Sequence, residues 1–530
     1  MKKIKNYIVG LGLPILYYGA LTGILTAALV VLYKWCVVRV VEWSTIGYAY
    51  VRAHLWVLAI VLPALFGLAA LFAWAYKKMP NLRGGGIPTS VGVLRGLLTF
   101  RWLRNLIGVF VMSLCSFLIG VPLGNEGPSV QMGVSVGGGL LAPMGKRQKG
   151  WGRYAMTGGA CVGFATATGA PISGILFAVE EAHERVSPVL LMVATVSVVF
   201  GRITSECLSP LLGVSQALFH VPSTLALGIG DLWLPILIGL AFGLFATLFL
   251  KYHKYMHAFV RKTLKKVGNT YKIFAVFFLT VVLGLLSTSF VSTGHAFVES
   301  LFATRAVWWF LLAALVVRST LTLFANVSGV TGGIFLPTIA IGVALAALLG
   351  ELFIGGFGLG EEYYILILAL GIVACIAGMM KMPITAIVFA VEALSCYNNI
   401  LHVIVVVAVA FFITELLGAH SIGDSVLHAR LEENAEGKHV TVFESFVCVQ
   451  AGAFAVGKQI RDILWSANMF VLSVAHPSNE AKADGLGSKV LRAGDVLHIR
   501  YSTYDAQRTE KELFDLVGQQ TMQAEEIERV

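Results

Sequence analysis

The chain has 530 residues, of which 57% are hydrophobic and only 13% are charged, and its mean hydropathy is +0.81. A soluble globular domain carries about 25% charged residues, so this composition excludes a soluble protein and makes the bilayer the solvent for most of the chain. The formal net charge of +10 is modest for this length and is spread over loops, which favours contact with anionic lipids and argues against nucleic acid as a partner.

Apolar runs of membrane-spanning length follow one another along roughly the first 420 residues. The clearest are Ile8 to Leu32, Leu55 to Tyr76, Leu234 to Leu250, Ile273 to Val291 and Val403 to Leu417. They predict roughly ten to fourteen membrane helices. Lys2, Lys3 and Lys5 precede the first run and place the N-terminus in the cytoplasm by the loop-charge rule. We therefore expect an integral protein of the plasma (inner) membrane.

The membrane part contains an internal repeat. The segment Pro171 to Glu180 reads almost letter for letter like Pro383 to Glu392, at an offset of 212 residues (383 − 171). A second pair, Pro128 to Gly133 and Pro337 to Gly342, has an offset of 209 (337 − 128), so the two pairs are nearly in phase. Duplicated halves of membrane proteins commonly form inverted repeats, with the substrate site at their interface among broken helices.

Three segments place glycines shortly before a proline where an apolar helix is expected to begin: Gly84 to Pro88, Gly124 to Pro128 and Gly333 to Pro337. Glycine lets a backbone amide approach a ligand closely, and proline suits the first helical position. Free amides and the positive end of the helix dipole make such a start an anion site. The alternative is a role in helix packing alone. The recurrence of the motif, twice at the repeat offset, favours the anion site.

Glu126 lies within the second of these helix starts, where the aligned repeat has Phe335. A carboxylate inside a membrane span costs about 2.5 to 3.5 kcal/mol at the bilayer centre, so it marks a functional site. Ionised, it can occupy the anion site in place of the anion, and neutralised it can leave. This exchange links anion passage to a proton.

Three further glutamates end apolar runs. Glu180 and Glu392 are repeat mates, for which we expect a structural role in capping or in bonding loop amides. Glu181 has no acidic counterpart, since Ala393 occupies its place in the other repeat. This difference predicts an asymmetric role for Glu181.

Together these motifs resemble the CLC family of chloride channels and chloride/proton antiporters, over about Tyr17 to Arg430. The resemblance implies an all-α polytopic membrane protein with an inverted-repeat helical fold, acting as a homodimer with one pore in each subunit. It implies that Glu126 is the external gating glutamate and Glu181 the internal proton-transfer glutamate. The implied anion-binding positions are Gly85, Gly86, Ile87, Asn125, Gly127, Ile334, Phe335 and Leu336.

Three residues depart from the family pattern. Asn125 stands where the family usually has arginine, a change that resembles the fluoride-exporting branch. Gly85 stands where a central-site serine is usual. The best alignment puts Asp424 at the inner-gate tyrosine, with a loose alignment or an ordinary helix-end residue as alternatives. In the family, a widened inner gate loosens coupling between anion and proton.

The composition changes after the membrane part, which we assign to residues 1–430. Residues 431–438 form a charged linker and 439–530 a small α+β cytoplasmic domain. Alternating apolar residues predict strands at 440–442, 471–474 and 496–500, with helices at 460–467 and 510–517. This tail resembles the TrkA-C ligand-binding module of ion transporters. The resemblance implies a dimeric regulatory domain that binds a cyclic dinucleotide in some relatives, and stabilisation of a dimer is the alternative.

The leading interpretation is a proton-coupled transporter of chloride or fluoride, with a passive anion channel as the alternative in the same class. The tail alone also fits a regulated cation channel or transporter, but no Thr-Val-Gly-Tyr-Gly filter is present in the sequence. A membrane enzyme is disfavoured because the sequence shows no nucleophile with a base. It also shows no metal-ligand cluster, and we expect no cofactor.

Overall fold

The computed structural model of the chain describes residues 8–84, 86–99, 101–143, 150–435, 440–476, 479–480, 485–503, 505–518 and 524–529. Gly85 of the predicted anion site lies outside the described residues, as do Lys2, Lys3 and Lys5 of the N-terminal segment.

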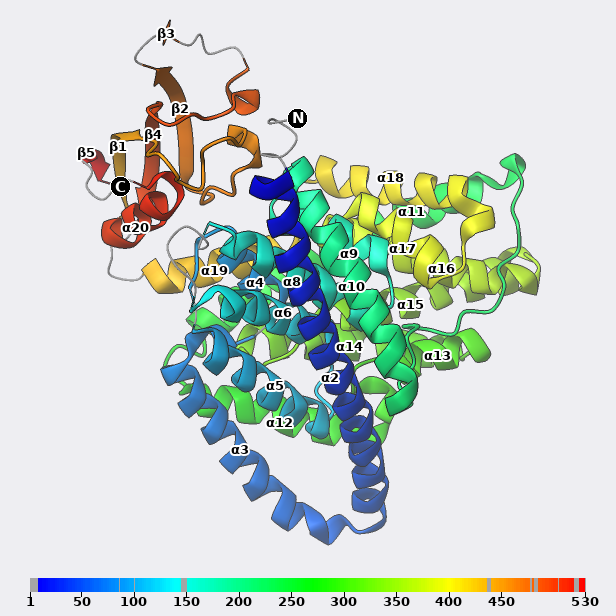
Figure 1. Cartoon of the computed structure of the whole chain (residues 1–530). Coiled ribbons are helices and arrows are strands. Elements are labelled where there is room, and N and C mark those ends of the chain that lie inside the picture. The colour runs from blue at the N-terminus through cyan, green and yellow to red at the C-terminus, as the bar shows by residue number, and fades with distance from the viewer. Residues whose placement is uncertain are drawn as a thin grey trace.

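The helical part is a duplicated bundle in which long outer helices surround shorter inner ones (Figure 1). The first half contains α2 (Leu13–Ala53), α3 (Leu58–Lys78), α4 (Ile87–Leu94), α5 (Trp102–Ile119), α6 (Glu126–Leu141), α8 (Gly152–Thr168), α9 (Pro171–Phe177) and α10 (Pro188–Leu212). Next come α11 (Trp233–Lys262), α12 (Asn269–Leu286), α13 (His295–Ala303), α14 (Trp308–Ser328), α15 (Phe335–Glu351), α16 (Tyr364–Cys375), α17 (Pro383–Ala393), α18 (Ile400–Leu416) and α19 (Ile422–Ala435). Among the described residues, 10 helices are long and apolar enough to cross a membrane, as the sequence predicts.

Close packing of the inner helices depends on glycine. On the faces where α6 and α8 meet, Gly133 lies against the carbonyl of Gly159, and Gly159 lies against the carbonyl of Gly133. A Cβ atom at either position would overlap that oxygen. Small residues let helices approach closely in a membrane, where no hydrophobic effect drives them together. This contact fixes the direction of α6, whose first residue is Glu126.

The C-terminal domain is a five-stranded antiparallel sheet with one helix packed on it. Its strands are β1 (Thr441–Cys448), β2 (Met469–His476), β3 (Asn479–Glu480), β4 (Val496–Thr503) and β5 (Ala524–Arg529), in the order β3-β2-β4-β1-β5. Helix α20 (Ala506–Val517) contains the helix expected at 510–517. The three predicted strands are confirmed. Helix α19 continues to Ala435 and so includes the first residues of the expected linker.

The prediction of a helix at 460–467 is wrong. Only a single 3-10 turn, Ile460–Asp462, forms there. The residues after it give their backbone groups to the membrane part instead. The Leu464 carbonyl accepts from Arg153 Nη1 at 2.8 Å, and the Ala467 amide donates to the Arg95 carbonyl at 2.8 Å.

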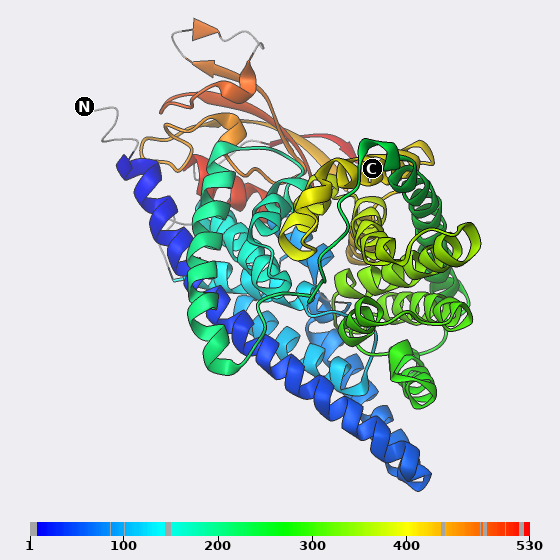
Figure 2. The same ribbon diagram turned by 90° about the vertical axis from the view of Figure 1, so that its right-hand side faces the viewer.

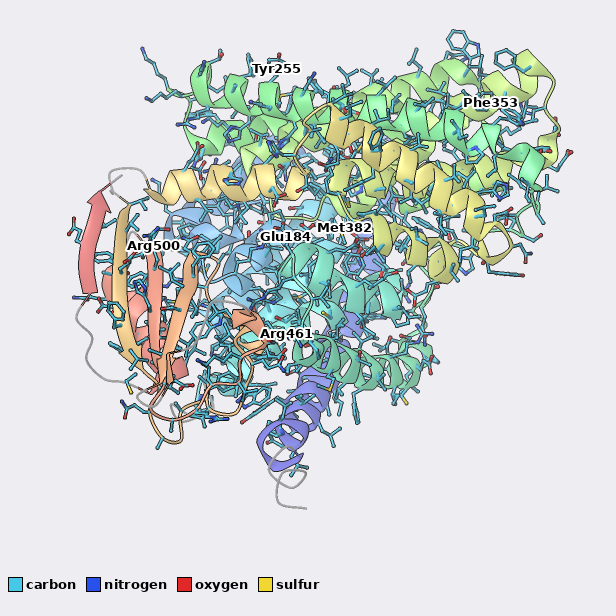
Figure 3. All side chains as sticks on the ribbon, turned by 90° about the horizontal axis from the view of Figure 1, so that it is seen from above. Glu184, Tyr255, Phe353, Met382, Arg461 and Arg500 are labelled. Carbon is cyan, nitrogen blue, oxygen red and sulfur yellow. The ribbon has the colours of Figure 1, made fainter. Side chains whose placement is uncertain are left out.

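The sheet and the start of α2 lie at the same end of the molecule, and the α2–α3 connection lies at the opposite end (Figures 1 and 2). We call these ends the domain face and the far face. Viewed from above, the sheet stands beside the helical bundle, and the turn with Arg461 lies over the helices near Glu184 (Figure 3). This docking is direct, since Ser187 Oγ donates to Asp462 Oδ1 at 2.9 Å.

Candidate functional site

The two repeats meet at a pair of glycines. The Gly124 amide donates to the Gly333 carbonyl at 2.7 Å, and the Gly333 amide donates to the Gly124 carbonyl at 2.7 Å. These glycines begin the second and third helix-start motifs of the sequence. The bridge therefore holds the N-termini of α6 and α15 side by side in the interior.

The first motif joins them. A Cβ atom on Gly127 would lie 2.7 Å from Gly333 Cα and 3.0 Å from Gly86 Cα, so all three motifs converge at positions that only glycine fits. Gly86 also has a φ of 118°, a conformation that favours glycine. Its amide is already used, however, because it donates to Gln131 Oε1 at 2.6 Å. Ile87 begins α4 directly after it.

Free backbone amides are concentrated at α6 and α15. The amides of Glu126 and Gly127, and those of Phe335 and Leu336, belong to first helical turns, where no intrahelical carbonyl precedes them. Asn125 and Ile334 are the residues immediately before the two helices. Two helix N-termini aimed at one point create a positive potential without a full charge.

Glu126 lies at this point. Its side chain is fully buried, and neither carboxylate oxygen has a hydrogen-bond partner in the described part of the chain. The carboxylate folds back against Gly124, in the space that a side chain there would need. A buried carboxylate without a bonded partner is costly, and therefore marks a functional position.

An aromatic cluster separates this point from the domain face. Phe335 packs edge to face against Phe164, with ring centroids 5.1 Å apart, and against Phe389 at 6.0 Å. Phe164 stacks on Phe177 at 5.5 Å. Phe177 ends α9, one helical turn before Glu181. The four phenylalanine rings form an apolar region that provides no proton acceptor.

Glu181 lies on the domain face in a charged environment. Its carboxylate contacts the start of α19, since a Cβ atom on Gly423 would lie 2.7 Å from Glu181 Oε1. Arg95 holds the local backbone by donating to the Glu181 carbonyl at 2.8 Å and the Ala182 carbonyl at 3.1 Å. Arg95 also forms an ion pair with Glu184 at 2.7 Å. This arrangement fixes the main chain at Glu181 through backbone hydrogen bonds.

Asp424 lies in the first turn of α19, near Glu181. The Asp424 amide donates to Ser421 Oγ at 2.9 Å, and Ser421 Oγ donates to Asp424 Oδ2 at 2.8 Å, a pattern that caps the helix. Asp424 also lies 3.9 Å from Arg95 Nη1. It lines a cavity of about 720 Å³ between α11 and α19 that opens on the domain face. The residue predicted for the inner gate thus has a capping role and faces this cavity.

The sequence profile of the family described as "Voltage gated chloride channel" matches residues 67–415. The chain belongs to this family. The H(+)/Cl(-) exchange transporter ClcA of Salmonella typhimurium (strain LT2) is 28% identical over 438 residues, which cover 80% of this chain and 90% of the relative.

Two solved CLC structures have the same fold. A slow cyanobacterial Cl-/H+ antiporter is 24% identical, with a TM-score of 0.71 over 79% of this chain and 98% of that one. A CLC-type fluoride/proton antiporter is 21% identical, with a TM-score of 0.62 over 76% of this chain and 95% of that one. Membership of the CLC family makes this chain an integral membrane ion-transport protein and not an enzyme.

Within this CLC chain, the structure adds one residue that the sequence analysis missed. Lys34 lies in the middle of α2, and its ammonium donates to the carbonyls of Thr166 and Ser215, each at 3.2 Å. Both carbonyls lie at or just after the C-terminal ends of α8 and α10, away from the C-terminal domain, which contacts the beginnings of these two helices. Lys34 is the cation that acts on the Glu126 carboxylate among the described residues. A lysine inside an apolar helix was the signal that could have revealed it.

Proposed function

We propose that this CLC protein exchanges a halide ion for protons across the membrane, with Glu126 as the gate. One observation carries the proposal: a fully buried carboxylate with unbonded oxygens occupies the point where the N-termini of α6 and α15 converge. That point attracts negative charge, and a carboxylate and a halide compete for it. The names of the relatives, a proton/chloride exchanger, a chloride/proton antiporter and a fluoride/proton antiporter, support the exchange and the halide.

The mechanism follows from the competition. Ionised Glu126 lies between the two helix N-termini and closes the path. A proton from the far face neutralises it, its attraction to the helix dipoles falls, and the halide takes its place on the amides of α6 and α15. Glu181 takes the proton to or from the domain face. Water must bridge the apolar region around Phe335 during this transfer, since the phenylalanine rings carry no proton.

Two features bear on the ion and on coupling. Asn125 is neutral where many relatives have arginine, which resembles the fluoride-exporting branch and makes fluoride a candidate beside chloride. Asp424 stands where the best alignment puts the inner tyrosine, and it lines an open cavity. This second feature favours loose coupling, with a passive anion conductance as its limit.

The C-terminal domain completes the proposal. We assign it to the cytoplasmic side together with the N-terminus, following the lysines before the first span. Its sheet and helix fit a TrkA-C-like regulatory module, for which a cyclic dinucleotide is the candidate ligand. We also propose that the chain is a homodimer, with an independent pore in each subunit.

Reconstitution of the full chain in liposomes tests the function. Halide efflux is measured with chloride and fluoride electrodes, and external pH is recorded at the same time, with and without a proton ionophore. We expect halide efflux coupled to proton movement in the unmodified protein. Glu126→Gln should keep halide flux and lose proton movement, whereas Glu362→Gln, an exposed carboxylate without a hydrogen bond in the described structure, should change neither. Halide flux without proton movement in the unmodified protein would establish the channel, and flux of potassium alone would refute both.

A further inference from the structure

A second cavity lies between the membrane part and the C-terminal domain. It has a volume of about 680 Å³, and its walls come from the start of α5, the end of α6, the start of α8 and the C-terminal domain. The apolar side chains on its walls include Leu141, Met156, Leu464, Met469 and Leu516. The interior therefore fits a hydrocarbon chain.

Two arginines that line this cavity have side chains without a partner among the described residues. Arg101 and Arg104 are exposed and line the cavity, and neither side chain makes a hydrogen bond or ion pair in the described part of the chain. The cation further inside is different, since Arg153 bonds Glu512 at 2.6 Å and Ser466 at 2.7 Å. The cavity thus combines an apolar wall with two arginines that form no ion pair in the described part of the chain, and its acidic lining residues are Glu512, which pairs with Arg153, and Asp515. This combination fits an anionic amphiphile.

The position of the cavity indicates the source of that amphiphile. Arg101 and Arg104 flank Trp102 and Leu103, both exposed, at the beginning of α5, a helix long and apolar enough to span the bilayer. Tryptophan and basic residues at the end of a span are anchors at the membrane surface. The leaflet on the domain face can therefore supply a lipid directly, and basic pockets at this level are known binding sites for anionic headgroups.

Gly96, which also lines the cavity, connects it to Glu181 through the neighbouring residue Arg95. Arg508 of the C-terminal domain donates to the Gly96 carbonyl at 2.8 Å, next to Arg95, whose side chain holds the Glu181 carbonyl. The Arg95 carbonyl in turn accepts from Ala467 of the domain at 2.8 Å. Arg95 and Gly96 belong to the loop that follows α4. A molecule inserted between this loop and the C-terminal domain changes how firmly Arg95 holds the main chain at Glu181.

We propose that this cavity binds an anionic phospholipid, with the headgroup phosphate on Arg101 and Arg104 and one acyl chain along the apolar wall. The bound lipid couples the state of the membrane to the loop that positions Glu181. The binding site stands independently of the transport function, whereas the effect on exchange rests on the function proposed above.

Native mass spectrometry of the full chain in neutral detergent tests the binding. Lipid adducts are measured as phosphatidylglycerol is added, with phosphatidylcholine as the comparison lipid. The proteins are the unmodified chain, R101Q/R104Q and the control K265Q/K266Q. The control removes two exposed lysines beyond the end of α11, on the same face. We expect phosphatidylglycerol adducts that weaken about fivefold for each arginine removed and are unchanged in the control. Equal retention in R101Q/R104Q would overturn the site.

Two further arms identify the ligand and its effect. Glycerol 1-phosphate offers the headgroup phosphate without acyl chains. It should fail to displace phosphatidylglycerol at millimolar concentration, and displacement would show a site for soluble phosphates and refute the lipid.

In liposomes, adding phosphatidylglycerol to phosphatidylcholine should change the exchange rate of the unmodified protein and the control several-fold, but not that of R101Q/R104Q. An equal response of all three proteins would refute coupling. Absence of any exchange in all of them, with adducts retained, would overturn the proposed function and leave the lipid site established.

Discussion

Glu180 and Glu392 each cap the helix that begins the other's repeat segment. The carboxylate of Glu180 accepts from the amides of Ile384 and Thr385 at 2.8 and 2.7 Å, at the start of α17. Glu392 accepts from Ile172 and Ser173 at 2.7 and 2.8 Å, at the start of α9. Each cap crosses from one half of the duplicated fold to the other, so the two helix N-termini are neutralised reciprocally.

These caps predict a symmetric loss of stability. Hydrogen bonds to a charged group contribute about 1.5 to 3 kcal/mol each, and glutamine keeps one of the two acceptor oxygens. Glu392→Gln and Glu180→Gln should therefore each lose one amide bond and lower the free energy of unfolding by about 2 kcal/mol. For a chain of this size that corresponds to a decrease in apparent Tm of about 2 °C, measured in detergent. Glu362→Gln serves as the control. A decrease for one glutamate and not the other would contradict the reciprocal role.

The convergence of glycines predicts a steric block at the site. A Cβ atom in Gly127→Ala would lie 2.7 Å from Gly333 Cα and 3.0 Å from Gly86 Cα. Both are backbone atoms, which cannot rotate away as a side chain could. We expect halide flux to fall more than tenfold in liposomes. Gly47→Ala on α2, which has open space around it, is the matched control and should keep full flux. Normal flux in Gly127→Ala would show that the three motifs do not need this close approach.

Much of the fold was accessible from the sequence because duplication leaves a direct trace in it. The offsets of 212 and 209 residues aligned Glu180 with Glu392 and Gly124 with Gly333, and the structure joins the halves at both places. The position of Glu126 at a buried helix start followed from glycine and proline patterns alone.

Other features depend on contacts between distant segments, which local patterns do not reveal. The Gly86 amide bonds Gln131, 45 residues away, so one of the expected anion donors is used by a side chain. The segment after Ile460 has a helical pattern, but its backbone bonds Arg153 and Arg95 of the membrane part and does not form a helix. The position of the Lys34 ammonium depends on carbonyls more than 130 residues away in the sequence, so local patterns do not predict it.

Asp424 offers a test of the coupling between anion and proton. Asp424→Tyr restores the residue that the family pattern expects, and it should narrow the path beside Glu181 and raise the number of protons moved per halide. Asp424→Asn keeps the size of the side chain and should change that ratio little. The ratio is measured from simultaneous halide and pH recordings in liposomes. If both variants keep the original ratio, Asp424 acts only as the cap of α19.

Lys34 should attract halide to the outer end of the path. Its ammonium is anchored by the carbonyls of Thr166 and Ser215, and its charge attracts the Glu126 carboxylate, so Lys34→Gln removes a positive charge that acts on the gate. We expect the KM for halide at the far face to rise several-fold at low ionic strength, with a smaller change in kcat. Salt screens such an attraction over about 10 Å at 0.1 M, so the difference should shrink as inert salt is added.

Two controls separate this electrostatic role from a structural one. Lys34→Arg keeps the charge and should restore the KM. Arg39→Gln removes an exposed charge from the same helix that pairs with Glu42 at 2.9 Å, and it should leave the KM unchanged. If Lys34→Gln raised the KM through a structural defect, the increase would persist in high salt, and Lys34→Arg would not restore the KM. A KM increase in Lys34→Gln that is equal at all salt concentrations would therefore refute the electrostatic role of Lys34.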